Sequence, residues 1–161
     1  DTLKGCTAQE IGTDAYKGLV AADADVAAHD GILSGWVLSP QGKAVLLNAV
    51  DGNKRPLFIN SVAEGAVPMI LGARASYSKG AYVADSTAAK KNVVGFGGDW
   101  TQAVYGTVEG VQITISDQAT LEDGSTTINL FQQNMFAVRA EIEVGFRCDT
   151  TVFNKLTVTG A

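Results

Sequence analysis

The chain has 161 residues, of which 46% are hydrophobic and 18% charged, a composition typical of a globular domain with its own core. Its formal net charge of -5 and its pI of about 4.7 argue against a protein that grips nucleic acid through a basic surface. No apolar run reaches the length of a membrane span. Cys6 and Cys148 lack the spacing of a metal site, so free, buried thiols are the expected state, with a disulfide between them as the alternative.

The charges are distributed unevenly along the chain. Residues 1–30 contain six acidic and two basic residues, a net charge of -4, whereas residues 54–91 contain six basic and two acidic residues, a net charge of +4. Such asymmetry could steer one copy of the chain onto another, head to tail. Two solvated faces would give the same pattern, and on charge alone they are the favoured interpretation.

The first helix is predicted over about 13–28. Thr13 is the expected cap, and Asp30-Gly31 supplies a stop signal. Spacings of four, three and four residues place one apolar stripe on this helix, formed by Ala15, Leu19, Ala22 and Val26. One side of the helix is therefore expected to face the core.

The second helix is predicted over about 41–50. Ser39 and Pro40 precede it, a pair typical of an N-cap followed by the first helical position. Apolar residues occur nearly all round this segment, so we expect the helix to be buried within the core. Asp51-Gly52 ends it.

The remaining chain is dominated by strand patterns. Short strands are predicted at 32–38, 67–73, 81–84, 93–96 and 152–158, and a half-buried one at 111–116. Period-two alternation extends over thirteen residues from Phe136 to Cys148, much longer than a usual strand, which suggests a ribbon whose polar face meets another surface. Two early helices followed mostly by strands predict the α+β class.

The residues offer no convergent catalytic set. His29 ends the first helix without an evident partner, and we expect it to be structural or exposed. The glycine-rich segment 95–99 lacks the Lys-Ser/Thr of a phosphate loop and is interpreted as a tight turn. Both signs of charge share the polar face of the long strand, which favours a salt-bridged face over the carboxylate pair of a hydrolase. These side chains are Arg139, Glu141, Glu143 and Arg147. We therefore predict no enzyme, no cofactor and no metal.

Four segments carry distinctive motifs in a fixed order. They are GWVLSPQGKAVLLNAVDGNKRPLF at 35–58, a Leu-Gly strand at 68–73, GFGGDWTQAVYG at 95–106 and NLFQQNMFAVRAEIEVGFRCDTTVFNKLT at 129–157. Together they resemble the C-terminal portion of the tailed-bacteriophage major capsid protein family, although Ala73-Arg74 stands where that family has Pro-Val. The resemblance implies the Hong Kong 97-type fold.

The resemblance also implies a division into domains. In that fold an axial domain, with a mixed β-sheet flanked by helices, points to the centre of each hexamer or pentamer, and a peripheral domain holds long strands. Residues 1–116 and 147–161 would belong to the axial domain, and 117–146 to the peripheral domain. The family's N-terminal arm, extended loop and spine helix do not precede Asp1, so we expect the chain to be the C-terminal part only.

The implied function is structural. Such proteins self-assemble into hexamers and pentamers of an icosahedral shell that encloses the DNA genome, within a virion made in the bacterial cytoplasm. Other copies are the main partner, scaffold, portal and decoration proteins are candidate partners, and neither sequence-specific nucleic-acid binding nor a membrane is implied. Candidate contact residues are Arg74, Lys79, Arg139, Glu141, Glu143 and Arg147. A cellular nanocompartment shell of the same fold and a β-rich binding module are the alternatives.

One feature of the family concerns covalent chemistry. Some members cross-link their subunits by an isopeptide bond between a Lys and an Asn, assisted by a Glu. Asn134 and Glu141 stand at the matching positions and are the candidates for this chemistry. The family's Lys lies on the extended loop, so ordinary polar contacts on the strand face are the favoured interpretation.

Overall fold

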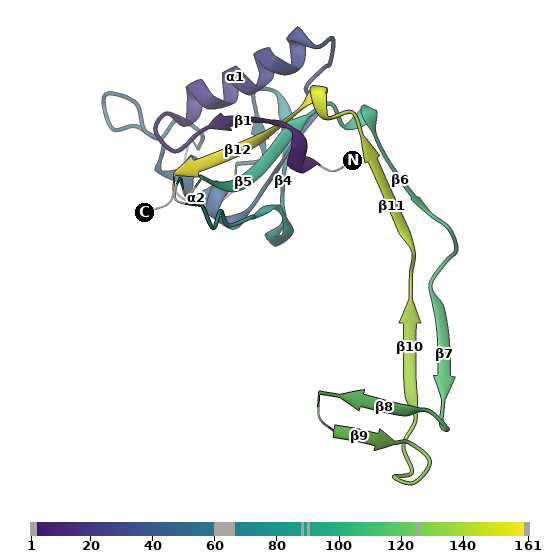
Figure 1. Cartoon of the computed structure of the whole chain (residues 1–161). Helices are drawn as coiled ribbons and strands as arrows, with labels where there is room; N and C mark the ends of the chain where they lie inside the picture. Colours follow the sequence, from purple (N-terminus) through teal and green to yellow (C-terminus); the bar gives the residue numbers. More distant parts are fainter. Residues whose placement is uncertain (1–2, 60–66, 88, 90, 125, 160–161) are drawn as a thin grey trace. The chain divides into compact units, whose positions relative to one another are not determined.

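The computed structural model describes residues 3–59, 67–87, 89, 91–124 and 126–159 (Figure 1). The chain forms two compact units. Unit 1 comprises Asp1–Val104 and Arg147–Ala161, and unit 2 comprises Tyr105–Phe146. The division falls earlier than the sequence-based boundary at 116/117, and it coincides with that boundary at 146/147. Two helices in the first part and strands thereafter agree with the predicted α+β class.

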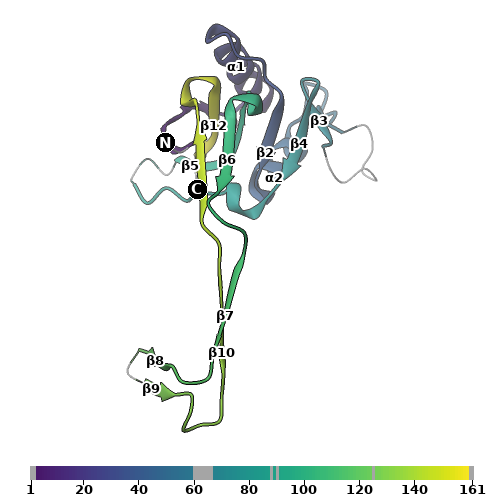
Figure 2. The same ribbon diagram turned by 90° about the vertical axis from the view of Figure 1, so that its right-hand side faces the viewer.

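Unit 1 is built on a six-stranded mixed sheet (Figures 1 and 2). Its strands, in spatial order, are β1 (Thr7–Glu10), β12 (Phe153–Thr159), β5 (Lys91–Gly98), β2 (Gly35–Leu38), β4 (Ala73–Tyr77) and β3 (Met69–Ile70). The pairs β1–β12 and β2–β4 are parallel and the others antiparallel. The beginning and the end of the described chain therefore lie side by side at one edge of the sheet.

Helix α1 (Ala15–Ala28) packs against β1, β12 and β5. The predicted stripe is confirmed, since Ala15, Leu19, Ala22 and Val26 are all buried. The predicted cap is wrong by one residue: Asp14 caps the helix, because its extended backbone lets its carboxylate accept a hydrogen bond from the amide of Lys17 at 3.1 Å. Asp30, with φ of 59°, reverses the chain after the helix.

Helix α2 (Pro40–Asn48) is capped by Ser39 as predicted, whose hydroxyl accepts a hydrogen bond from the amide of Gly42 at 3.1 Å. The expectation of a helix buried all round is wrong. Only Gly42 and Leu46 are buried, because α2 covers the sheet from outside and only one stripe of it reaches the core. Both helices contribute to the same buried cluster, which includes Trp36 and Leu38 of β2.

The glycines of β5 make room for this core. A Cβ on Gly97 would lie 2.2 Å from the ring of Trp36, and one on Gly95 would lie 2.6 Å from Leu38. The indole of Trp36 in turn donates a hydrogen bond to the carbonyl of Ile70 at 3.0 Å. The interpretation of 95–99 as a tight turn is therefore wrong: residues 95–98 are strand, and the turn begins only at Asp99.

Two other strand predictions fail because turns intervene. The segment 67–73 is not one strand, since Leu71 and Gly72, with φ of 48° and 79°, form the turn of the β3–β4 hairpin. The segment 81–84 is not a strand either. It contains the end of the 3₁₀ helix η3 (Lys79–Ala81) and a single bridge between Val83 and Val93.

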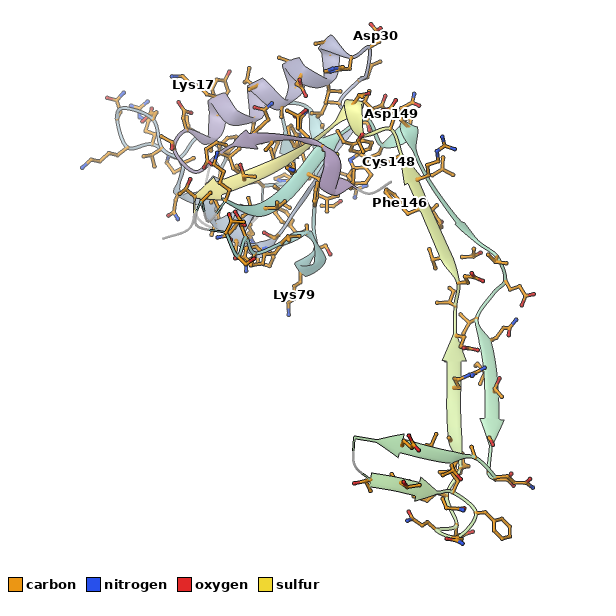
Figure 3. All side chains as sticks on the ribbon, viewed as in Figure 1. Lys17, Asp30, Lys79, Phe146, Cys148 and Asp149 are labelled. Atoms are coloured by element: carbon orange, nitrogen blue, oxygen red, sulfur yellow. The ribbon has the colours of Figure 1, made fainter. Side chains whose placement is uncertain are left out.

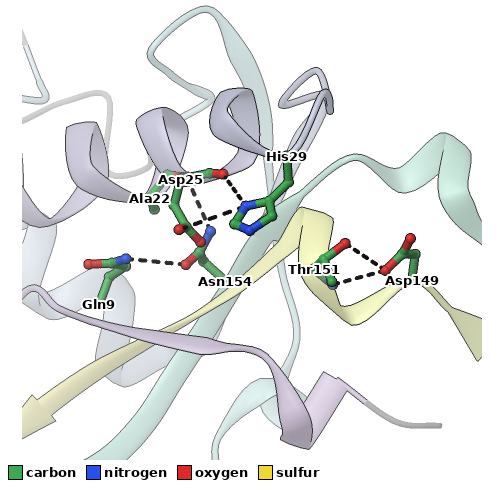
Figure 4. A network of polar contacts seen from close by, with 7 residues as sticks. All are labelled: Gln9, Ala22, Asp25, His29, Asp149, Thr151 and Asn154. Carbon is green, nitrogen blue, oxygen red and sulfur yellow. Dashed lines mark hydrogen bonds and ion pairs between the residues drawn. The ribbon is translucent and has the colours of Figure 1, made fainter.

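A buried polar residue ties the elements of unit 1 together (Figure 4). Asn154, which is fully buried, donates a hydrogen bond to the carbonyl of Ala22 in α1 at 3.2 Å and accepts one from Gln9 in β1 at 3.3 Å. His29 is half-exposed at the end of α1, with Nδ1 2.8 Å from the carbonyl of Asp25, which fits the expected structural role.

A second, smaller cluster holds both cysteines. Cys6 and Cys148 are free and buried beside Val152 and Phe153, as expected from their spacing. Burial, followed by the nearby Cys148 thiol, raises the pKa of Cys6 to about 11. At neutral pH the thiol of Cys6 is therefore protonated and behaves as a small apolar side chain.

Unit 2 consists of antiparallel strand pairs. β7 (Gln112–Ser116) pairs with β10 (Ala137–Glu141), and β8 (Thr120–Asp123) pairs with β9 (Thr126–Asn129). A third pair, β6 (Ala103–Thr107) with β11 (Val144–Cys148), connects the two units along the chain. The predicted thirteen-residue strand is thus two strands, β10 and β11, interrupted at residues 142–143.

Candidate subunit interface

The β7–β10 ribbon presents an apolar face to solvent. In its register Val138 lies opposite Ile115, and Ala140 lies opposite Ile113, so these four side chains share one face. Ile113, Ile115 and Val138 are 66%, 68% and 57% exposed. The prediction of a half-buried strand at 111–116 is therefore wrong for the single chain, because nothing in the described chain covers this face.

The opposite face of the same ribbon is polar. Arg139 and Glu141 lie two residues apart on β10, and their side chains form an ion pair at 2.8 Å. Thr114 lies opposite Arg139, and Gln112 lies opposite Glu141. The salt-bridged face predicted from the alternation is therefore present on β10. Both charged side chains are more than half exposed, so the pair itself adds little to stability.

The other two charged residues of the predicted polar face are not part of this pair. Glu143 follows β10, and its carbonyl accepts a hydrogen bond from the amide of Val108 at 3.3 Å. Arg147 lies in β11 and belongs to unit 1. The alternation predicted one continuous polar face, but the break at residues 142–143 divides it into two parts.

The two cross-link candidates lie at opposite ends of β10. Asn134 lies in the turn before this strand, where it has φ of 52°, and Glu141 is the last residue of the strand. The strand alone separates these ends by about 14 Å, at about 3.4 Å per residue. Within one chain the structure does not bring the two side chains together.

The remaining contact candidates lie in unit 1. Arg74 is in β4 and Lys79 begins η3, and both are exposed. Neither has an ion-pair partner among the residues that the structure describes. They therefore belong to a different unit from the β7–β10 ribbon.

A second apolar surface was not predicted from the sequence. It lies between β9 and β10, where Phe131 and Phe136 are 74% and 69% exposed and Met135 is 40% exposed. Figure 3 draws all side chains of the described residues. Leu130 is the only buried residue among the described residues of unit 2. The signal was the apolar content of the segment 130–136, which by itself does not reveal whether a turn is exposed.

Two observations on the described residues concern metals and membranes. These residues contain no group of three or more His, Cys, Asp or Glu side chains placed to hold a metal ion. None of the helices that they form combines the length and the apolar character needed to span a membrane.

Sequence comparison identifies relatives among phage proteins. A model of the phage capsid family matches residues 3–150. Two proteins named probable major capsid protein gp17, from Mycobacterium phages D29 and L5, are 37% identical over 124 residues and 39% identical over 119 residues. Each match covers 70% of this chain and 36% of the relative, so the chain spans little more than a third of these proteins.

Comparison with solved structures finds the same fold. A chain of Gordonia phage Cozz superposes with a TM-score of 0.79 at 19% identity, over 100% of this chain and 52% of that one. A chain of Mycobacterium phage Ogopogo gives 0.77 at 18% identity, over 99% and 56%. The capsid of the empty GTA particle gives 0.60 at 13% identity, over 88% and 44%. The fold is thus the Hong Kong 97-type predicted from the motifs, and the chain belongs to the phage capsid family.

Proposed function

We propose that this chain is the shell-building part of a tailed-phage major capsid protein. Copies associate into hexamers and pentamers of an icosahedral shell around the DNA genome, and the protein resides in the head of the virion. Its role is structural and not enzymatic. Other copies of the same protein are its main partners, with scaffold, portal and decoration proteins as further candidates.

The observation that carries this proposal is the exposed apolar face of the β7–β10 ribbon. A two-stranded ribbon without a core is marginally stable in water. Burying an Ile or Val side chain is worth about 1.5–3 kcal/mol, so covering Ile113, Ile115 and Val138 contributes several kcal/mol to association. A surface that is apolar on one side and ion-paired on the other suits an assembly protein, because it gains its stability from neighbours.

The proposed domains are matched to the two compact units of the structure. Unit 1, with its own core, corresponds to the proposed axial domain, and unit 2 corresponds to the proposed peripheral part. The compact units divide the chain at 104/105, which supports including β7 in the proposed peripheral part. The proposed roles of Arg139 and Glu141 are polar contacts on the strand face.

The test is assembly of the full-length gene product, observed by negative-stain electron microscopy. We expect closed shells or ring-shaped capsomers from the wild-type protein. Ile113→Asp and Ile115→Asp should abolish them, because each buries a charge in the covered face at a cost of several kcal/mol. Thr120→Asp is the matched control, since Thr120 is exposed in β8, outside the β7–β10 ribbon and opposite the neutral Asn129, and should leave assembly intact.

Three outcomes of the assembly experiment would contradict the proposal. A wild-type protein that stays monomeric at every salt concentration would contradict the shell function and favour a β-rich binding module. Closed particles without packaged DNA, formed in the native host, would point instead to a nanocompartment shell. Assembly of the I113D and I115D variants at the wild-type level would show that the apolar face of the ribbon is not a contact surface.

A further inference from the structure

The outer side of α1 carries an exposed stripe of mixed character. Tyr16, Val20 and Asp23 follow one another at spacings of four and three residues, which place them on one side of the helix. Tyr16 is 52% exposed and Val20 is 39% exposed, although both are large and apolar. Asp23 is exposed and has no ion-pair partner among the described residues. We call these three residues the α1 stripe.

The β3–β4 hairpin carries a surface of the opposite charge. Met69 and Leu71 are 58% and 42% exposed. Met69 lies directly opposite Arg74 in the register of the hairpin, so their side chains share a face. We call Met69, Leu71 and Arg74 the hairpin patch. It therefore matches the α1 stripe in composition, with two apolar side chains and one unpaired charge.

The two surfaces lie at different ends of unit 1. Helix α1 packs on β1, β12 and β5, whereas β4 and β3 form the opposite edge of the sheet. The stripe and the patch of one chain therefore cannot meet each other, but those of two copies can.

We propose that the α1 stripe of one copy packs against the hairpin patch of the next copy, with Asp23 paired to Arg74. This inference rests on the proposed shell function and names the contact that closes its rings. The contact is heterologous, because two different surfaces meet, and repeated rotation of such contacts generates a ring. It also gives a use to the net charges of -4 in residues 1–30 and +4 in residues 54–91.

A charge-swap experiment on the full-length gene product tests the contact. The variants are Asp23→Arg, Arg74→Asp and the double variant D23R/R74D, which keeps the net charge of the wild type. Each single reversal places like charges opposite each other, so we expect the protein concentration needed for ring formation to rise about tenfold. The double variant should restore the wild-type concentration. Sedimentation velocity measures the ring fraction, and electron microscopy verifies its shape.

The controls separate this contact from general effects. Glu122→Arg reverses an exposed charge in β8, outside both surfaces and both charged segments, and should change ring formation less than twofold. All variants should unfold at the wild-type temperature, since both partners are exposed. Single variants that assemble like the wild type, or a double variant that stays defective, would overturn the Asp23–Arg74 contact while wild-type shells still support the proposed function. A wild type without rings or shells would overturn both.

Discussion

At the residue scale, the core of unit 1 depends on the absence of a side chain at Gly97. The ring of Trp36 occupies the space that a Cβ would need, and Trp36 is only 1% exposed. Its indole is held in place by the hydrogen bond to Ile70. Moving the ring would break that hydrogen bond, and moving the backbone of β5 would disturb its pairing with β2 at Gly97 and Trp36. This glycine is therefore required for packing and not for an unusual backbone angle.

We predict that Gly97→Ala destabilises the protein by about 3 kcal/mol or more, because overpacking of a tight core costs about 1–3 kcal/mol and a contact of this closeness lies at the severe end. Urea denaturation, followed by tryptophan fluorescence, measures the change. Gly106→Ala is the control: this strand glycine has nothing within 4 Å of its Cβ position, so the variant should unfold like the wild type. Equal effects of the two substitutions would contradict the packing argument.

At the element scale, two 3₁₀ helices of unit 1 are capped in the same way, by an Asp whose carboxylate accepts two hydrogen bonds from the Thr two residues later. In η4 (Trp100–Gln102) the carboxylate of Asp99 accepts hydrogen bonds from the hydroxyl of Thr101 at 2.6 Å and from its amide at 3.0 Å. In η5 (Thr150–Val152) Asp149 and Thr151 form the same pair of bonds, at 2.7 Å and 3.0 Å. The hydrogen bond from the Thr101 hydroxyl is the main reason why the pKa of Asp99 is lowered from its ordinary 3.8.

This lowered pKa predicts an acid-dependent contribution to stability. A carboxyl group with a depressed pKa in the folded state stabilises the protein above its unfolded pKa, and that contribution is lost as pH falls through the folded pKa. We expect Asp99→Asn to lower the melting temperature by about 2–4 °C at pH 7. The difference from the wild type should shrink as pH falls below 3.8.

Differential scanning calorimetry between about pH 2.5 and 7 measures that difference. Thr101→Val provides the matched variant, because it keeps the Asp99 carboxylate but removes the hydroxyl donor. The pKa of Asp99, followed by NMR, should then move back toward 3.8. A difference between wild type and Asp99→Asn that is constant over the whole pH range would show that charge is not involved.

Local patterns in the sequence predicted the elements whose signals are local. The apolar stripe of α1 and the Ser39 cap of α2 follow from helical spacing and from capping chemistry, which neighbouring residues determine. Local patterns did not predict how far α2 is buried, nor that 67–73 forms a hairpin. Both features depend on what packs against these segments. Leu71 adopts a left-handed backbone conformation in the turn. This conformation is rare for Leu, so the residue type does not predict a turn there.

The candidate interface could be predicted only in part for the same reason. Alternation along 136–148 correctly predicted an apolar and a charged face and placed Arg139 beside Glu141. It did not reveal that β7 is the partner strand, since that register joins residues more than twenty positions apart. It also concealed the break at residues 142–143, where the alternation continues although the strand does not.

At the scale of the whole molecule, the two units are stabilised in different ways. Unit 1 buries a cluster that includes Trp36, Leu38 and Leu156 between its sheet and both helices. Among the described residues of unit 2, only Leu130 is buried. The large apolar side chains of Ile113, Ile115 and Val138 are each more than half exposed. Within the described chain, unit 2 therefore has little buried apolar surface to stabilise it.

This difference predicts how hydrogen exchange changes with assembly. In the isolated chain, amides of β7 and β10 should exchange at least about ten times faster than those of β5 and β12, because a ribbon without a core opens at little cost in free energy. In assembled shells of the full-length protein, β7 and β10 should become protected, while β5 and β12 change little and serve as the internal control. Mass-spectrometric hydrogen exchange on both samples measures this. If β7 and β10 were already as protected as β5 and β12 in the isolated chain, unit 2 would be stable by itself, and its exposed apolar face would not depend on a neighbour.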